Sequence, residues 1–151
     1  MTETLTLLDT RLSDLDKILP LIQDFYQHFG YKYSKADKER TILELFEHPT
    51  KGCLWLIAKE QKIVGYVFLS LYFSLEFGGQ TAFIDELFIL PGDRGQGLGS
   101  KVIGLVEQKC RQLNLRAIHL ESEITNERAT ALYLKSGFVD YNRRLMTKTL
   151  V

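Results

Sequence analysis

The chain has 151 residues, of which 45% are apolar and 25% charged, and this suits one domain with a single substantial core over residues 1–151. Lysine plus arginine equals aspartate plus glutamate at 19 each, so the sequence gives no electrostatic case for a nucleic-acid or anionic-membrane partner. No apolar run reaches the roughly 20 residues of a membrane span. Cys53 and Cys110 lack metal-binding or disulfide spacing, so we expect a cytoplasmic protein without a metal site.

The N-terminal third predicts one short strand and two helices. Residues 5–8 form an apolar run that is typical of a strand. Apolar residues then recur at helical spacing over residues 15–29, although Pro20 lies within this helix and predicts a kink or a split. Ser34 is a typical N-cap for a second helix, which the sequence ends at Pro49.

The middle of the chain predicts an antiparallel meander followed by a long helix. Residues 54–58 and 63–73 are rich in β-branched and aromatic residues and are separated by a short polar break, as in a hairpin. Two consecutive glycines then form a turn before a third strand at residues 81–90. A long amphipathic helix follows and ends at Asn114.

The C-terminal part predicts three more strands and one helix. Residues 117–123 alternate in polarity, so we expect a strand, and Asn126 then caps a helix that Gly137 ends. Residues 138–141 and 145–149 are expected to be final strands. The order of elements indicates an α/β protein of the α+β type, with one sheet covered by helices on both faces.

A glycine-rich loop joins the strand at residues 81–90 to the long helix. Glycine has no Cβ, so the backbone takes positive φ and a ligand can approach its N–H groups closely. The first turn of the helix adds unpaired N–H donors and the positive end of the helix dipole. These features predict a site for a phosphate or pyrophosphate. The residues concerned are Arg94, Gly95, Gln96, Gly97, Leu98, Gly99 and Ser100.

Two other glycine-rich nucleotide motifs do not fit this loop. A Walker loop needs a lysine directly before its Ser or Thr, whereas Gly99 precedes Ser100. A dinucleotide fingerprint follows the first strand of a βαβ unit and has an acid about 20 residues further on. Here the loop follows an antiparallel meander in the second half of the chain, and Glu121 stands late for that role.

A third pattern, Arg/Gln-x-x-Gly-x-Gly/Ala after a hydrophobic-x-Pro step, fits at every position. The step is Ile89-Leu90-Pro91, and a second motif lies downstream in frame, at Asn126, Ala129, Tyr133, Gly137 and Phe138. On these residues the whole chain resembles the GNAT superfamily of N-acetyltransferases. One departure is Asp93, where relatives often carry an aromatic residue; because an acid beside a phosphate loop is unfavourable, we expect Asp93 to point to solvent.

The resemblance implies a fold and a cofactor. The fold is a twisted, mostly antiparallel sheet of about seven strands with about four helices, in which the strands at residues 81–90 and 117–123 splay apart. The donor is acetyl-CoA and the acceptor is a primary amine. Loop N–H groups would hold the pyrophosphate, and the strand before the loop would pair with the pantetheine amides. The implied cofactor-binding residues are Leu87, Phe88, Ile89, Arg94, Gly95, Gln96, Gly97, Leu98, Gly99, Ser100, Asn126, Ala129 and Tyr133.

The resemblance also implies catalytic roles. Tyr133 occupies the position of the family's usual general acid, and an unperturbed phenol, with a pKa of about 10, is protonated at neutral pH. Glu86 is the first candidate for the base that deprotonates the amine, with Asp85 second. Neighbouring strand residues face opposite sides, so only one of them is expected to face the substrate. Periodicity alone favours a core aromatic at Tyr133, whereas Asn126 and Gly137-Phe138 in frame with it favour the general acid.

The acceptor site is expected near the first two helices. Aromatic side chains suit a cation, and acids add negative charge, so the candidate substrate-binding residues are Tyr26, Phe29, Tyr31, Tyr33, Asp85 and Glu121. Aromatic residues of this kind also serve simply to cover a sheet. The acceptor remains open between polyamine-like or aminoglycoside-like molecules, peptides and proteins. A non-catalytic acyl-CoA sensor is the alternative function, and a homodimer is possible.

Overall fold

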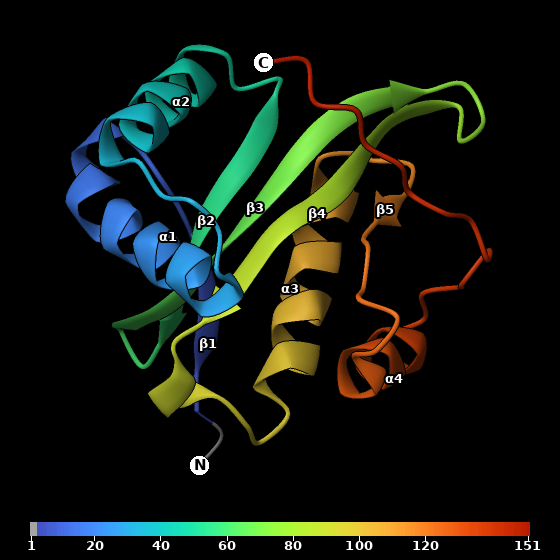
Figure 1. Cartoon of the computed structure of the whole chain (residues 1–151). Coiled ribbons are helices and arrows are strands. Elements are labelled where there is room, and N and C mark those ends of the chain that lie inside the picture. Colours follow the sequence, from blue (N-terminus) through green and yellow to red (C-terminus); the bar gives the residue numbers. More distant parts are fainter. Residues whose placement is uncertain (1–2) are drawn as a thin grey trace.

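In the computed structural model, residues 3–151 form one sheet with helices on both faces (Figure 1). In chain order the elements are β1 (Leu5–Asp9), the 3-10 helix η1 (Leu12–Asp14), α1 (Leu15–Phe29), α2 (Lys35–Glu47), β2 (Gly52–Lys59), β3 (Lys62–Ser74), β4 (Gly79–Ile89), the 3-10 helix η2 (Pro91–Asp93), α3 (Leu98–Gln112), β5 (Ile118–His119) and α4 (Glu127–Lys135). The expected α+β class is confirmed.

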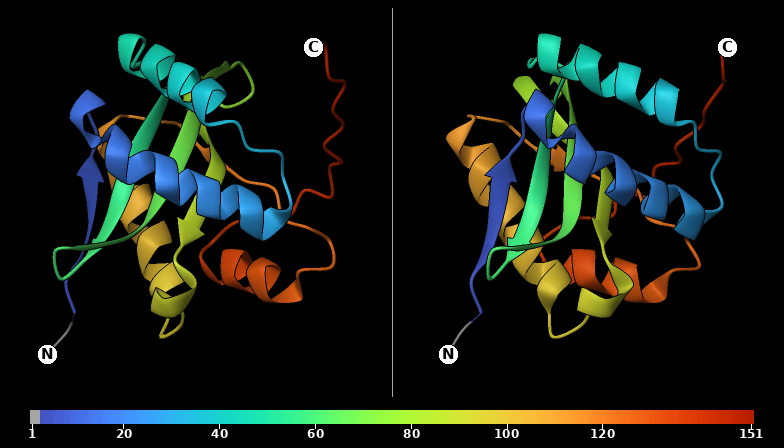
Figure 2. Two further views of the ribbon diagram at one scale, coloured as in Figure 1. Left: turned by 60° about the vertical axis from the view of Figure 1, so that its left-hand side comes forward. Right: turned by 90° about the vertical axis from the view of Figure 1, so that its left-hand side faces the viewer.

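The sheet has the order β1-β2-β3-β4-β5, with antiparallel pairs up to β4 and a parallel pair between β4 and β5. Its central strands are apolar on both faces, so each face carries a core. Leu54 and Leu56 of β2 pack under α1 and α2, whereas the alternate residues Trp55 and Ile57 pack against α3. Figure 2 shows α1 and α2 on one side of the sheet and α3 on the other.

Local capping signals in the sequence are confirmed. Gly30 ends α1 with a left-handed φ of 70°. The Ser34 hydroxyl accepts from the Asp37 N–H at 3.3 Å at the start of α2. The Asn126 side chain accepts from the Ala129 N–H at 3.1 Å at the start of α4.

Of the expected kink or split at Pro20, the split is wrong, because α1 runs through this residue as one helix. Pro20 removes one backbone donor but lies on the exposed face of the helix. Ile18, Leu19, Leu21 and Ile22 beside it are buried in the core under the sheet. Tertiary packing of these residues therefore outweighs the lost hydrogen bond.

The sheet is smaller than expected, with five strands in place of about seven. Residues 138–141 and 145–149 are not strands, and β5 covers only Ile118–His119 of the expected 117–123. A strand needs a partner, and after His119 the chain leaves the edge of β4. Within residues 3–151, no helix is long and apolar enough to cross a membrane.

Candidate active site

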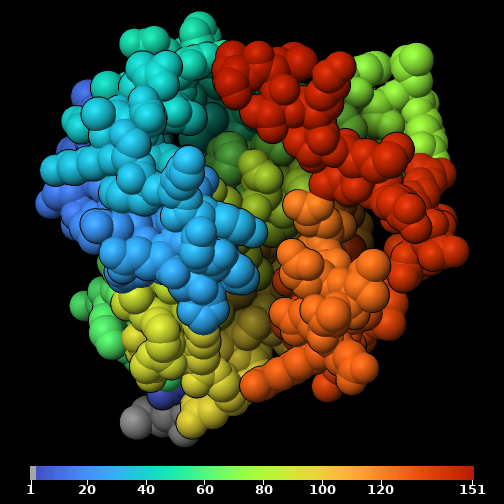
Figure 3. Space-filling view, in the orientation of Figure 1, coloured from blue at the N-terminus to red at the C-terminus, as the bar shows by residue number. Residues whose placement is uncertain are grey.

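One edge of β4 is open beside the glycine loop. β4 and β5 pair at two positions only, Ala82 with Ile118 and Phe83 with His119. From residue 84 onward, no strand within the described chain lies beside β4 on the side away from β3. This is the divergence of the two strands that the family resemblance implied. In Figure 3 the yellow atoms of the β4–α3 region remain visible between the blue α1 side and the orange α4 side.

The peptide groups of Leu87 and Ile89 face this open edge. The Leu90 N–H donates to the Val64 carbonyl at 2.8 Å, so Leu90 belongs to the ladder with β3. The Ile89 carbonyl instead accepts from Arg94 Nε at 2.7 Å, on the other side. Because successive peptide groups of a strand alternate in direction, Leu87 shares the orientation of Ile89. The edge thus offers backbone donors and acceptors to an extended chain of amides.

The loop after β4 presents a concentration of free N–H groups. Three successive residues have positive φ, namely Gly95 at 98°, Gln96 at 55° and Gly97 at 73°. This conformation lets several amides point the same way. Within the described chain, no acceptor receives a hydrogen bond from the loop N–H groups of Gly95, Gln96, Gly97, Gly99 or Ser100. An oxyanion of a phosphate would satisfy them.

Cationic side chains surround the loop. A small hollow is lined by Lys59, Arg94 and Lys101 together with the loop backbone and Glu3, whose carboxylate pairs with Lys59 at 2.8 Å. Asp93 also lines it, but its carboxylate pairs with Lys62 at 3.1 Å and its side chain is only 16% exposed. The expectation that Asp93 points to solvent is therefore wrong, because the ion pair neutralises this acid beside the anion site.

Gly99 has a packing role in addition to any approach by a ligand. A Cβ at this position would lie 3.1 Å from Cδ2 of Leu132 in α4, so the glycine allows α3 and α4 to pack closely. A Cβ at Gly95 or Gly97 would meet nothing within 4 Å, and these two glycines are required by their positive φ.

A β-bulge places both acids of β4 near the same side of the sheet. Phe68 pairs with Glu86 and Leu69 with Ile84, so Asp85 is an extra residue without a partner in β3. Ile84 packs on the α3 side, whereas Glu86 contacts tyrosines on the α1 side. In a regular strand these two residues would share a face. The expectation that only one acid faces the substrate side is wrong for this reason.

Glu86 is the centre of a polar network. Tyr26 donates to Oε1 at 2.7 Å, and the fully buried Tyr66 donates to Oε2 at 2.9 Å. Lys38 Nζ donates to the Tyr26 hydroxyl at 2.7 Å and lies 4.1 Å from the centre of its ring. Burial and the neighbouring Glu86 carboxylate raise the pKa of both phenols, so Tyr26 and Tyr66 remain donors at neutral pH.

Asp85 lies close to this network without a hydrogen-bond partner in the described chain. Its negative charge contributes to the raised pKa of Tyr26, and desolvation raises the pKa of the Asp85 carboxyl itself. Lys38 acts in the opposite direction on Asp85. The two acids therefore differ: Glu86 is held at both oxygens, whereas Asp85 is accessible and free to accept a proton.

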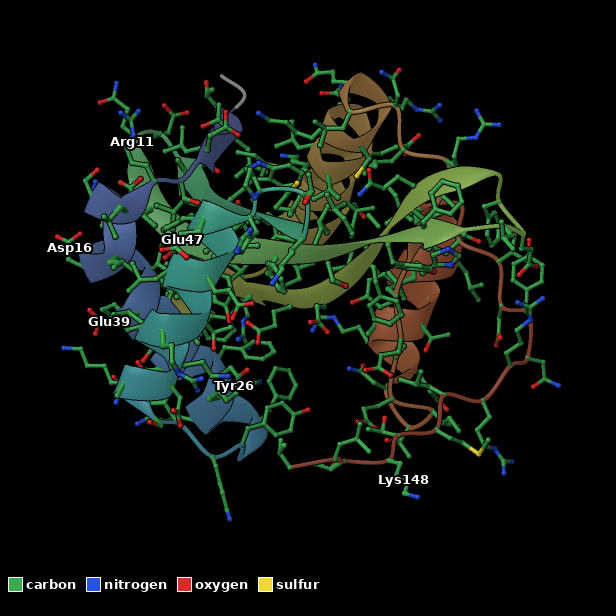
Figure 4. All side chains as sticks on the ribbon, turned by 90° about the horizontal axis from the view of Figure 1, so that it is seen from above. Arg11, Asp16, Tyr26, Glu39, Glu47 and Lys148 are labelled. Atoms are coloured by element: carbon green, nitrogen blue, oxygen red, sulfur yellow. The ribbon has the colours of Figure 1, made fainter. Side chains whose placement is uncertain are left out.

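The expected aromatic residues come together beside these acids. Tyr26 packs edge to face on Tyr31 at 5.7 Å, and Phe29 stacks on Tyr31 at 5.8 Å. The ring centres of Tyr33 and Tyr26 lie 6.3 Å apart. Figure 4 labels Tyr26 on the α1 side of the molecule. Phe29 and Tyr31 are about half exposed and can contact a ligand.

Glu121 is not brought to this cluster. It lies exposed after the end of β5, and none of the hydrogen bonds or ion pairs found in residues 3–151 involves it. Tyr66 and Lys38, in contrast, belong to the site and were not predicted. A tyrosine in the middle of an apolar strand signals a buried hydroxyl that needs a partner, but the sequence does not identify that partner.

Tyr133 lies on the opposite face of the sheet from Glu86. It is half-buried against the same core as the side chains of Leu87 and Ile89, and it packs edge to face on Phe138 at 6.0 Å. Burial raises the pKa of its phenol, so the hydroxyl is protonated at neutral pH. Asn126 and Ala129 are engaged with each other at the cap of α4. No group of acids, histidines and cysteines within residues 3–151 is placed to hold a metal ion.

Comparison with known proteins defines the class. The model of the acetyltransferase (GNAT) family matches residues 15–138, and the chain belongs to this family. Several of the curated relatives that it matches are named N-acetyltransferases. It is 30% identical over 95 residues to the aminoalkylphosphonate N-acetyltransferase of Salmonella typhimurium, a match that covers 63% of this chain and 61% of that enzyme. It is 27% identical over 127 residues to a putative [ribosomal protein bS18]-alanine N-acetyltransferase of Bacillus subtilis, covering 84% and 76%.

Solved structures agree on the fold. An integron cassette protein from the mobile metagenome of Cole Harbour Salt Marsh is 32% identical, with a TM-score of 0.84 over 96% of this chain and 90% of that one. A predicted acetyltransferase from Clostridium acetobutylicum, solved with acetyl-CoA, has a TM-score of 0.76 at 13% identity, covering 96% of each chain. At this identity the second likeness concerns the fold alone.

Proposed function

We propose that this chain transfers the acetyl group of acetyl-CoA to a primary amine, with both substrates bound together. The observation that carries this proposal is the open β4 edge at residues 84–89, which ends in a loop of unpaired N–H groups. An edge and a loop so joined suit a long ligand with amides at one end and a diphosphate at the other. Acetyl-CoA is such a ligand, and it supplies an activated thioester.

Different residues of the chain bind different parts of acetyl-CoA. The loop N–H groups and the side chain of Lys101 bind the diphosphate, whereas Lys59 is already paired with Glu3. The peptide groups of Leu87 and Ile89 pair with the pantetheine amides, and Arg94 releases the Ile89 carbonyl when they do so. An N–H on this edge then faces the thioester oxygen and stabilises its developing negative charge.

The two acids have different roles in this proposal. Glu86 already accepts hydrogen bonds from two phenols at 2.7 and 2.9 Å, so it acts as a fixed negative charge that attracts the ammonium group of the acceptor. Asp85 has no such partner and takes the proton, directly or through water, before the amine attacks. This assignment reverses the order that the sequence favoured.

Tyr133 is the proposed general acid. Its phenol keeps its proton at neutral pH because burial raises its pKa, and it lies on the face of the sheet opposite the acids. The amine thus approaches from the α1 side while the leaving thiolate receives a proton from the α4 side. Tyr133→Phe is expected to lower turnover about 10²-fold or more, which is the usual contribution of an acid, with cofactor affinity near wild type. Unchanged turnover would remove this role.

The proposed acceptor is a small amine that an aromatic wall and two carboxylates bind as a cation. Relatives with 30% and 24% identity are named for aminoalkylphosphonates and aminoglycosides. A peptide amino terminus is the second candidate, because a relative with 27% identity is named for the alanine of a ribosomal protein. Release of free CoA over a panel of these three acceptor types and polyamines separates the candidates.

Calorimetric titration with acetyl-CoA tests the first requirement of the proposal, which is that the chain binds this cofactor. Saturable binding with one site per chain is expected, and the absence of binding at millimolar ligand would overturn it. Binding without release of CoA from any acceptor in the panel would instead favour an acyl-CoA sensor. Gly104→Ala, in the middle of α3 where a Cβ meets nothing within 4 Å, is a control that should bind as wild type does.

A further inference from the structure

Lys38 of α2 brings an amine of the chain itself into the proposed acceptor site. Its Nζ donates to the Tyr26 hydroxyl at 2.7 Å and lies 4.1 Å from the centre of that ring. The same hydroxyl donates to Oε1 of Glu86 at 2.7 Å. The amine therefore lies against an aromatic ring and two hydrogen bonds from a carboxylate, which is the environment proposed above for the ammonium group of an acceptor.

The ammonium group of Lys38 is not held by an ion pair. Five other lysines of residues 3–151 pair with a carboxylate, whereas none of the ion pairs found there involves Lys38. The side chain is half-buried, and its one hydrogen bond within this range is the bond to Tyr26, so it keeps unused donors. Because the charge sits on a flexible stem, the amine can turn toward the acids without breaking a salt bridge.

Lys38 and the proposed base interact across the site. Desolvation raises the pKa of the Asp85 carboxyl, and the charge of Lys38 lowers it. Asp85 has no hydrogen-bond partner in the described chain and projects from the bulge of β4 near the same side of the sheet as Glu86. The amine and an acid that can take its proton thus belong to one cluster.

The acids and the proposed cofactor edge lie on the same strand. Glu86 directly precedes Leu87, whose peptide group faces the open edge of β4. An acetyl group carried along this edge arrives next to the acids. The side chain of Lys38, which already contacts the acids through Tyr26, is placed to receive it.

We propose that Lys38 is an internal acceptor, so that the chain acetylates its own side chain when acetyl-CoA is bound; this inference rests on the function proposed above. Nζ of Lys38 loses a proton to Asp85, directly or through water, and attacks the thioester carbonyl. A bond forms between Nζ and the acetyl carbon, and the C–S bond breaks. The thiolate takes a proton from Tyr133 and leaves as free CoA. The product amide has no positive charge.

Mass spectrometry of the full chain, incubated with acetyl-CoA and no added amine, tests this proposal. A gain of a single acetyl group per chain is expected, and peptide mapping should place it on Lys38. Lys38→Arg keeps the positive charge but has no amine to acetylate, so this gain should be lost. Lys35→Arg, at an exposed lysine of the same helix, is the matched control and should be modified at the wild-type rate.

Two further measurements separate this reaction from other routes to acetyl-lysine. Asp85→Asn should slow the modification of Lys38 by about tenfold or more, whereas spontaneous acetylation by acetyl-CoA does not need this acid. The rate constant should stay the same when the protein is diluted, because donor and acceptor are bound in one copy. Modification of Lys38 that is no faster than that of Lys35, or that slows on dilution, overturns the proposal.

Wild type supplied with the amine panel shows which of the two proposals is at fault. Release of CoA to an added amine, with Lys38 unmodified in the absence of that amine, would overturn the internal acceptor alone. No binding of acetyl-CoA by calorimetry would overturn the proposed function and this inference together.

Discussion

At the scale of single residues, the site depends on the hydrogen bonds that stabilise the partly buried carboxylate of Glu86. Its two oxygens each accept from a tyrosine, and one of these tyrosines, Tyr66, is fully buried. Hydrogen bonds to a charged acceptor are worth more than neutral ones, and a buried group left unpaired loses its full solvation. Tyr66 therefore serves both the fold and the placement of the charge.

Tyr66→Phe tests that double role. Removing the hydroxyl leaves Oε2 of Glu86 without its buried donor, so unfolding in urea should require about 1–3 kcal/mol less free energy. Tyr72→Phe, at a tyrosine that is 42% exposed, is the matched control and should change stability by less than about 0.5 kcal/mol. Equal stability of the two variants would show that the Tyr66 hydroxyl contributes nothing.

The different environments of the two acids predict a difference in pH dependence. Desolvation raises the pKa of Asp85, so this carboxyl takes up its proton at a higher pH than an ordinary aspartate. A base must be unprotonated, so kcat is expected to fall as the pH drops through this raised pKa. Asp85→Asn should lower kcat about 10²-fold or more and abolish this acid limb.

Glu86→Gln is the comparison for Asp85→Asn. It removes the fixed charge but leaves the proposed base, so it should raise KM for the amine more than it lowers kcat, and the acid limb should persist. If the limb disappears in Glu86→Gln and remains in Asp85→Asn, the roles of the two acids are the reverse of those proposed. The profile is measured as kcat and kcat/KM against pH with one amine from the panel.

At the scale of elements, the sequence predicted what local chemistry determines. The caps at Gly30, Ser34 and Asn126 follow from side-chain and backbone preferences within four residues, and they are observed. The glycine loop was found for the same reason. The bulge at Asp85 was not, because it depends on how β3 and β4 align across the sheet and no residue type signals it.

The expected strands at residues 138–141 and 145–149, and the expected length of β5, were wrong for a related reason. Residues 138–149 have the composition of strands. Composition indicates that a segment can form a strand, but it does not indicate whether a neighbouring strand is present to pair with it. Tyr26 of α1 contacts Glu86, whereas Glu121 was expected on a strand that ends two residues earlier, at His119. Interactions between distant segments decide these cases.

Replacing a glycine by alanine is expected to have opposite effects on stability in the glycine loop and in helix α3, which follows it. Gly97 has a φ of 73°, where a Cβ costs roughly 1–2 kcal/mol, so Gly97→Ala should destabilise the chain and weaken acetyl-CoA binding by about tenfold or more. Gly104 lies in the middle of α3 with free space around it. Gly104→Ala should stabilise the chain by about 0.5–1 kcal/mol and leave binding unchanged. Thermal unfolding and calorimetry on both variants provide the comparison.

At the scale of the whole molecule, the open site links cofactor binding to stability. A ligand that binds only the folded chain stabilises it by about 2.7 kcal/mol at one hundred times its Kd. Since about 1 kcal/mol shifts the melting temperature of a domain of this size by about 2–4 °C, saturating acetyl-CoA should raise Tm by roughly 5–10 °C. Because charge pairing at an accessible loop is screened by salt, the rise measured at a fixed ligand concentration should shrink as salt is added. Pantetheine, which lacks the diphosphate, should stabilise far less, since the free N–H groups of residues 95–100 are left without their ligand. An equal rise with both compounds would place the binding energy on the β4 edge alone and would deny the loop its role.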